Sequence, residues 1–432
     1  MTINHHFKIK KYLLFLKYKE LLVLMVILIT PSEFTHAQSN IPDSVNFKDS
    51  LSNLQFTSKI DTAHHEKDLI DVLRKGLKIK NVVQPEISSK NSLGPFLSFL
   101  PAVGYAIASG YIAALNSNIS FYTGRKVRKI SSVLIGIYYS QYNQYWSVIN
   151  SNIYTKNENL NFIGDWRIYK FPTQTFGLGS SSLPVNADKI DYNYLKIYQV
   201  VLQKVFPNLF IGLGYHLDYH SGIREINIMP VITDIQKYGY NIKSNSSGIS
   251  LNFLCDSRTS SINPLKGTYC NLQLRHNFTF LGSDNSWKSI IIDAREYLKF
   301  PAKSRNVLAF WSYNYFTYGY IPYLDMPSTG WDAYNNTGRG YAQGRFRGKN
   351  LIYFESEYRF SLTRNGLFGG VVFVNVESLT EWPKNNFGIF VPGYGVGARI
   401  KINKRSGTNV AIDYGIGNHG SKGFSFNLGE LF

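Results

Sequence analysis

A stretch rich in glycine and arginine, residues 338–350 (GRGYAQGRFRGKN), holds the residues of this chain that are best suited to do chemistry. Its glycines allow the backbone to turn back tightly, and its guanidinium groups can form paired hydrogen bonds with carboxylates. The stretch lies between two segments that alternate like long β-strands. We therefore expect a basic loop that enters an acidic cavity, and not an ordinary surface turn.

A His-x-Asp-x-His pattern, His216, Asp218 and His220, is the second candidate. Alternate residues of a strand share one face, so these three side chains are predicted to face the lumen of a barrel. They could bind a metal, but we favour polar lining of the lumen and predict no metal and no cofactor. Because no nucleophile motif or Ser/His/Asp order stands out either, we predict that the protein is not an enzyme.

Two cysteines, Cys255 and Cys270, flank a predicted turn and would lie on neighbouring antiparallel strands. Two interpretations stay open. The thiols form a disulfide in an oxidising compartment, or they remain unpaired in the barrel wall. We favour the unpaired thiols.

The composition favours strands over helices, since 15% of the 432 residues are aromatic and only four are methionine. After residue 94 the chain repeats segments of roughly ten residues that alternate apolar with polar, separated by turns and longer loops. An open sheet would expose unpaired backbone to lipid. We therefore predict an all-β fold, a transmembrane antiparallel β-barrel of about 16 strands with an inward-folded loop between strands 11 and 12. The uncharged run 91–124 is predicted to form strands 97–108 and 111–122, with a transmembrane helix as the alternative.

The N-terminal part predicts export. A lysine-rich start precedes the apolar run 21–29, and Thr35-His36-Ala37 supplies small residues at a cleavage site, so residues 1–37 are expected to be a signal peptide, with an uncleaved anchor as the alternative. Residues 38–93 are expected to be a polar periplasmic segment with one short helix at 64–80 that links, plugs or braces the barrel, and residues 94–432 the barrel.

The formal net charge is +18. In an exported chain this predicts contact with outer-membrane lipid and with lipopolysaccharide phosphates. No nucleic-acid motif is present, so no nucleic-acid partner is expected. The expected location is the outer membrane of a Gram-negative-type bacterium.

Alternation along the C-terminal strands predicts a charged cluster inside the barrel, beside the loop that carries Arg339. The side chains assigned to the lumen are Glu355, Glu357, Arg359, Phe373, Asn375, Glu377, Arg399, Lys401 and Asp413.

Several motifs resemble those of the bacterial surface antigen family, the barrel of outer-membrane protein assembly factors and two-partner-secretion transporters. The resemblance covers about residues 94–432. The residues that carry it are Asp256, Arg258, Pro264 and Gly267 of a hairpin turn, the loop tip Arg339-Gly340-Tyr341, and Glu357 on strand 12.

The resemblance implies that Arg339 enters the lumen and pairs with Glu357. The family's Phe-x-Asp-x-Gly motif on strand 13 has Asn375 and Glu377 at its last two fixed positions here, so one expected carboxylate is missing. Glu355 or Glu377 is expected to compensate. The C-terminal Phe432 is either a barrel insertion signal or a packing residue.

The family resemblance also implies a role in protein or lipid translocation or insertion at the outer membrane. Residues 38–93 are too few for the periplasmic polypeptide-transport-associated domains of such proteins, so we expect a separate periplasmic or outer-membrane partner. The alternative is a passive pore or a structural outer-membrane protein.

Overall fold

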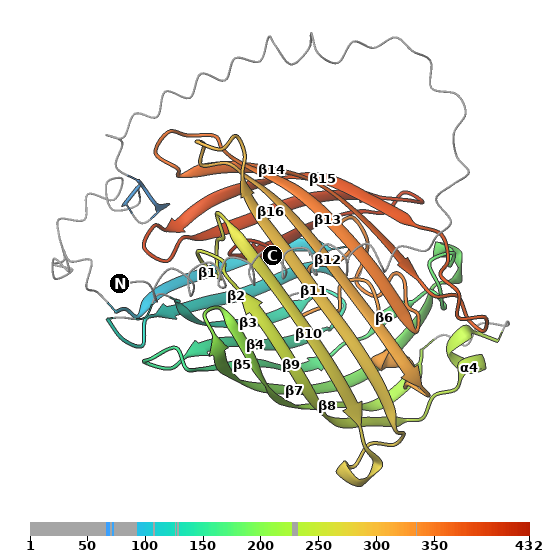
Figure 1. Ribbon diagram of the computed structural model, residues 1–432. Coiled ribbons are helices and arrows are strands. Elements are labelled where there is room, and N and C mark those ends of the chain that lie inside the picture. Colours follow the sequence, from blue (N-terminus) through green and yellow to red (C-terminus); the bar gives the residue numbers. More distant parts are fainter. Residues whose placement is uncertain are drawn as a thin grey trace, which may run out of the picture. The chain divides into compact units, whose positions relative to one another are not determined.

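The computed structural model in Figure 1 shows strands that follow one another in chain order around one curved wall. It describes residues 66–69, 71–72, 93–106, 109–125, 127, 129–226, 232–333 and 335–432. All of them belong to the unit Ile60–Phe432. The expected signal peptide and most of the expected periplasmic segment lie outside the described residues.

The described part of the chain contains one sheet of 17 strands. Every ladder in it is antiparallel. Strand β6 has only 3 residues and pairs with the start of β7, which leaves 17 − 1 = 16 strands in the wall. The predicted barrel class and its strand number of about 16 are confirmed.

The strands are β1 (Phe96–Ala106), β2 (Gly110–Phe121), β3 (Ser131–Ser140), β4 (Tyr145–Tyr154), β5 (Leu160–Lys170), β6 (Thr173–Thr175), β7 (Asp188–Phe206), β8 (Leu209–Glu225), β9 (Lys243–Asp256), β10 (Gly267–Asn277), β11 (Trp287–Lys299), β12 (Val307–Gly319), β13 (Asn350–Ser361), β14 (Phe368–Leu379), β15 (Val391–Asn403), β16 (Thr408–Gly417) and β17 (Lys422–Leu428). Among the described residues, the helical elements with defined bounds are the short helix α4 (Asp234–Tyr238) and the 3-10 turns η1 (Pro184–Asn186), η2 (Thr279–Leu281) and η3 (Tyr323–Asp325).

Alternation along each strand explains why these residues form a membrane wall. On β14, Val372 and Val374 are 44% and 54% exposed on the outer face, whereas Phe373 and Asn375 are buried on the inner face. The 12 residues of β14 are enough for a tilted strand to cross a hydrocarbon core of about 30 Å.

The uncharged run 91–124 forms the hairpin β1–β2, in which Leu97 pairs with Ile119. The strand interpretation of this run is therefore confirmed. Among the described residues, no helix is long and apolar enough to cross a membrane.

The wall has two different ends. At the long-loop end lie the connections 171–187, 226–242 and 320–349; at the short-turn end lie tight turns such as 362–367 and 404–407. The edge strands β1 and β17 lie next to each other. Among the described residues, the ladders run from β1 to β17 and none joins these two strands.

The interior is packed with aromatic side chains. One cluster joins Trp311 of β12 and Tyr353 of β13 to Phe346 of the 320–349 loop and to the C-terminal Phe432. Each of these four side chains is at most 3% exposed. The loop is therefore part of the barrel core.

Candidate functional site: an ion-pair lock in the lumen

The 320–349 loop turns into the barrel at glycines that no other residue could replace without strain. Gly338 and Gly340 have φ angles of +72° and +105°, which disfavour any other residue. A Cβ atom on Gly340 would lie 2.8 Å from the backbone carbon of Ile416 on β16. The loop tip thus lies directly against the barrel wall.

Arg339, between these two glycines, contacts three carboxylates. Its Nη2 donates to Oε2 of Glu357 at 2.6 Å, and its Nη1 donates to Oδ2 of Asp413 at 2.9 Å. Nη2 also donates to Glu355. The three acids come from β13 and β16, so one guanidinium connects the loop tip to two parts of the wall.

The lock is buried. Arg339 is 5% exposed, and Glu355, Glu357 and Asp413 are at most 1% exposed. The guanidinium also lies over the ring of Phe373, 3.6 Å from its centroid. Burial alone would lower the pKa of Arg339, but the three neighbouring carboxylates raise it well above its ordinary value. The side chain therefore stays charged.

Two more arginines hold these carboxylates from the other side. Arg359 donates to Glu357, and Arg399 donates to Oδ1 of Asp413 at 2.5 Å. Arg399 also donates to Glu430 at 2.8 Å. Two of the three acids that pair with Arg339 are thus also held by arginines of the wall, an arrangement that reduces the entropy lost when they pair with the loop.

Asn375 has a role that an aspartate could not fill. Its Nδ2 donates to the backbone oxygen of Arg339 at 3.0 Å, whereas an ionised carboxylate only accepts hydrogen bonds. The ladder between β13 and β14 places Glu355 directly opposite Asn375. Glu355 and Asn375 therefore lie side by side on neighbouring strands, and both contact Arg339.

Glu377 does not contact Arg339 within the described structure. It accepts a hydrogen bond from Oγ1 of Thr329 at 2.9 Å and is 0% exposed. Glu377 thus holds the loop at Thr329, whereas Glu355 pairs with Arg339. Sequence reasoning placed Asp413 in the lumen but did not identify it as a third partner of Arg339.

Tyr341 fastens the other side of the tip. Its hydroxyl donates to the backbone oxygen of Pro392 on β15 and accepts from the backbone nitrogen of Asn418 at 2.9 Å. A Cβ atom on Gly417 would lie 2.5 Å from the Tyr341 ring. Arg339, Gly340 and Tyr341 therefore all contact β16 of the C-terminal wall. Arg339 also reaches β13, and Tyr341 also reaches β15.

The predicted turn motif forms a separate unit at the short-turn end. Arg258 pairs with Asp256 at 3.0 Å. Pro264 is buried. Gly267 has a φ angle of +112°, and a Cβ atom there would lie 2.5 Å from the Ser257 oxygen. None of the described contacts of this turn involves Arg339.

The C-terminal tail, residues 429–432, leaves the wall and turns inward after β17. Nδ2 of Asn336 in the loop donates to the backbone oxygen of Leu431 at 2.6 Å. Arg359 donates to the backbone oxygen of Phe432 at 2.9 Å. The Phe432 ring stacks on Trp311 with 5.1 Å between centroids. Phe432 is thus an interior residue that packs on the wall, while its neighbour Leu431 contacts the loop.

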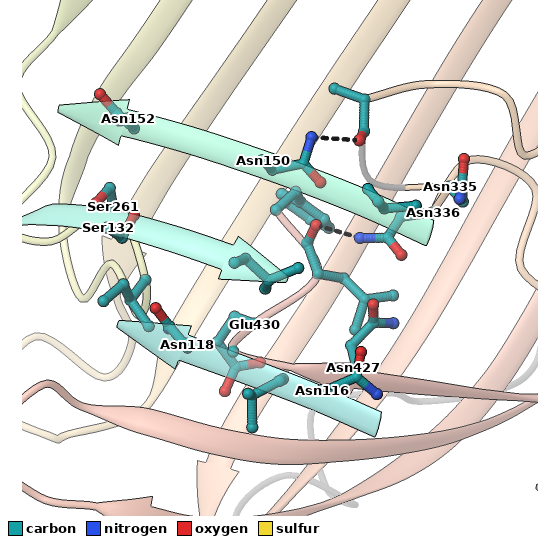
Figure 2. A pocket seen from close by; sticks show the side chains of 18 of the residues that line it. Asn116, Asn118, Ser132, Asn150, Asn152, Ser261, Asn335, Asn336, Asn427 and Glu430 are labelled. Atoms are coloured by element: carbon teal, nitrogen blue, oxygen red, sulfur yellow. Dashed lines mark hydrogen bonds between the residues drawn. The ribbon is translucent and has the colours of Figure 1, made fainter. Parts of the chain in front are cut away.

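A cavity of about 120 Å³ lies between this tail and the wall of β2, β3 and β4. Figure 2 shows Asn336, Asn427 and Glu430 beside the asparagines of β2 and β4 that line the same cavity. Neutral amides dominate this lining, whereas charges dominate the lock.

The His-x-Asp-x-His segment also faces the lumen. Asp218 accepts hydrogen bonds from Tyr194 at 2.6 Å and pairs with Arg275 at 2.8 Å; His216 shares a hydrogen bond with Ser250. His220 lies 3.4 Å from Asp325. In the part of the chain that the structure describes, no group of three or more His, Cys, Asp or Glu is arranged to hold a metal.

Cys255 and Cys270 are direct partners in the β9–β10 ladder, and both are free thiols. Directly opposed residues have Cα atoms about 4.5–5.5 Å apart, within the range of disulfides. We expect a membrane-permeant oxidant to join them within one molecule, as measured by peptide mass mapping. A Cys255→Ser variant is the control. If the parent gives no linked peptide, the side chains do not approach as the register implies.

The fold and the lock together define a transmembrane β-barrel whose lumen holds a fastened loop. No family model and no curated protein sequence matches this chain. Among solved structures, it is similar to BamA from Haemophilus ducreyi lacking POTRA domains 1-3, with 14% identity and a TM-score of 0.49 over 77% of this chain and 69% of that one. It is also similar to CdiB from Acinetobacter baumannii, with 11% identity and a TM-score of 0.47 over 79% of this chain and 66% of that one.

Proposed function

We propose that this protein is an integral outer-membrane barrel that aids translocation or insertion of proteins, or of lipids, with the Arg339 lock as its controlled element. The proposal includes an export signal at 1–37, a periplasmic segment at 38–93 and the barrel at 94–432. The observation that carries it is that one buried guanidinium joins the loop tip to Glu355, Glu357 and Asp413.

A buried ionic network holds a loop no more stably than well-packed apolar side chains would, so stability alone does not explain this one. Desolvation costs several kcal/mol per buried ion, and well-packed apolar side chains are often at least as stable in the same space. Ion pairs specify one position of the loop, and the loss of one central residue releases all of them together. These properties suit an element with two discrete positions.

The apolar side chains of the loop and the tail, which pack inside the lumen, favour this proposal over a permanently open pore. Phe346 of the loop is 1% exposed, and Leu431 and Phe432 of the tail are 2% and 3% exposed. A steady conductance would need a continuous aqueous path, whereas these apolar side chains pack inside the barrel. The passive pore remains the alternative, and it predicts large conductance from the purified protein.

The net charge of +18 supports a lipid environment with phosphate groups, namely outer-membrane lipid and lipopolysaccharide. A separate periplasmic or outer-membrane protein partner is part of the same proposal.

Depletion of the protein in its own host tests the function. We expect the abundance of outer-membrane or secreted proteins to change before permeability to small solutes changes, as measured by time-resolved proteomics and dye uptake. Arg339→Ala should fail to restore the proteome, whereas an Arg345→Ala control should restore it. If depletion alters only solute uptake and the purified barrel conducts steadily, the protein is a pore.

A further inference from the structure

Three neighbouring turns at the short-turn end form a strongly basic surface. The turns 300–306, 362–367 and 404–407 contain five lysines and arginines and no aspartate or glutamate. These residues are Lys303, Arg305, Arg364, Lys404 and Arg405, and all five are exposed. We call them the basic turn surface. Like charges this close attract an acidic partner.

A segment ahead of the barrel, described at residues 66–69 and 71–72, already covers part of the basic turn surface. Glu66 lies 3.1 Å from Arg305 and 3.4 Å from Lys401. Asp71 pairs with Lys404 at 2.6 Å. Two acidic side chains thus contact two of the three turns.

The backbone takes part in the same contact. The backbone nitrogen of Lys67 donates to the backbone oxygen of Asn365 at 3.1 Å. The backbone nitrogen of Lys404 donates to Asp68 at 3.1 Å. The contact with this segment therefore uses main-chain groups as well as charges.

The spacing of the acids fits one helical turn. Asp68 accepts from the backbone nitrogen of Asp71 at 2.9 Å, and Val72 donates to the backbone oxygen of Asp68 at 3.3 Å. Residues three apart in a helix share a face, so both aspartates reach Lys404. Partial burial acts to raise the pKa of Asp71, but the hydrogen bond from Lys404 and its neighbours keep that pKa below its ordinary value.

The basic charge exceeds what this segment neutralises. Within the described structure, Lys303, Arg364 and Arg405 form no ion pair. We propose that the basic turn surface is a docking site for an acidic peptide segment of a partner protein, and that residues 66–72 occupy this site in the free protein. The proposal does not depend on a translocation role, so either can fail without the other.

The covalent connection gives residues 66–72 a high effective concentration, so a free peptide should bind the parent protein weakly. We would measure fluorescence anisotropy of a labelled peptide of residues 66–72 with the full chain in detergent micelles. In the variant Glu66→Gln/Asp68→Asn/Asp71→Asn, which frees the surface, binding should tighten about fivefold, and high salt should abolish it.

Adding Lys404→Gln and Arg405→Gln to that variant should weaken peptide binding by about fivefold. Adding Lys266→Gln, on the β9–β10 turn, is the matched control and should change nothing. The proposal is overturned if the freed variant binds the peptide no better than the parent, or if the Lys404 and Arg405 changes have no effect. Binding of phosphatidylglycerol vesicles in place of the peptide would assign the surface to lipid and overturn it as well.

Discussion

Arg339→Ala is expected to release the 320–349 loop and to lower the free energy of unfolding by about 3–5 kcal/mol, because it leaves the buried Glu355 without an ion-pair partner. Glu357 and Asp413 would keep only the arginines of the wall, Arg359 and Arg399. Glu355, Glu357 and Asp413 would lose a common partner while they stay at most 1% exposed. Trypsin provides the measurement, since Arg347 in the same loop is 3% exposed in the parent. Cleavage after Arg347 should become fast in the variant.

Arg345→Ala is the matched control for this experiment. Arg345 is buried in the same loop, but its guanidinium donates to Ser182 and forms no ion pair within the described structure. Its replacement should cost less, about 1–2 kcal/mol. Equal cleavage rates in the parent and in Arg339→Ala would refute the lock.

A second variant keeps the test informative if Arg339→Ala does not fold. In Arg339→Ala/Glu355→Gln, the carboxylate that has lost its only arginine becomes a neutral amide of the same shape, while Glu357 and Asp413 keep Arg359 and Arg399. We expect the barrel to regain stability while the loop stays open to trypsin, because neutral groups remove the desolvation cost without restoring the connection.

Phe432→Ala is expected to destabilise the purified barrel by about 3–5 kcal/mol, the range for removal of a buried phenylalanine ring. The ring is 3% exposed and stacks on Trp311. The shift in the temperature of heat-dependent gel migration measures the effect. Phe426→Ala is the control, since Phe426 is 40% exposed and should change stability by less than about 1 kcal/mol.

The same pair of variants separates the two roles left open for Phe432. If the purified Phe432→Ala barrel is as stable as the Phe426→Ala barrel but inserts poorly in cells, the residue is an insertion signal. If stability falls and the fraction inserted follows it, packing is the role.

Alternation explains how much of the wall could be predicted from the sequence. Val372 and Phe373 already imply opposite faces, because successive side chains of a strand point to opposite sides. The loop was recognisable because its glycines and arginines interrupt that alternation. These are local signals, and they need no knowledge of which strands meet.

The partners of Arg339 and the path of the C-terminal tail depend on strand register and on the curvature of the wall. Neither property can be read from the sequence. Glu355 and Glu377 both point inward on adjacent strands, but Glu355 lies opposite Asn375, whereas Glu377 lies opposite Tyr353. Asp413 reaches Arg339 from β16, and only the closing curve of the wall brings β16 and β13 to one guanidinium. The sequence pattern also does not predict that the tail turns inward after Gly429, since strand alternation continues to Leu428.

The opposition of Glu355 and Asn375 has a consequence for how such locks are recognised. A carboxylate can occupy the facing position on the neighbouring strand and still pair with the same arginine. The sequence motif that would contain this carboxylate is then no longer present. The ion pair requires a carboxylate at the right position of the strand ladder, and it does not require a particular residue in a linear motif. Searches that compare cross-strand pairs should therefore detect relatives of this barrel that searches along the chain overlook.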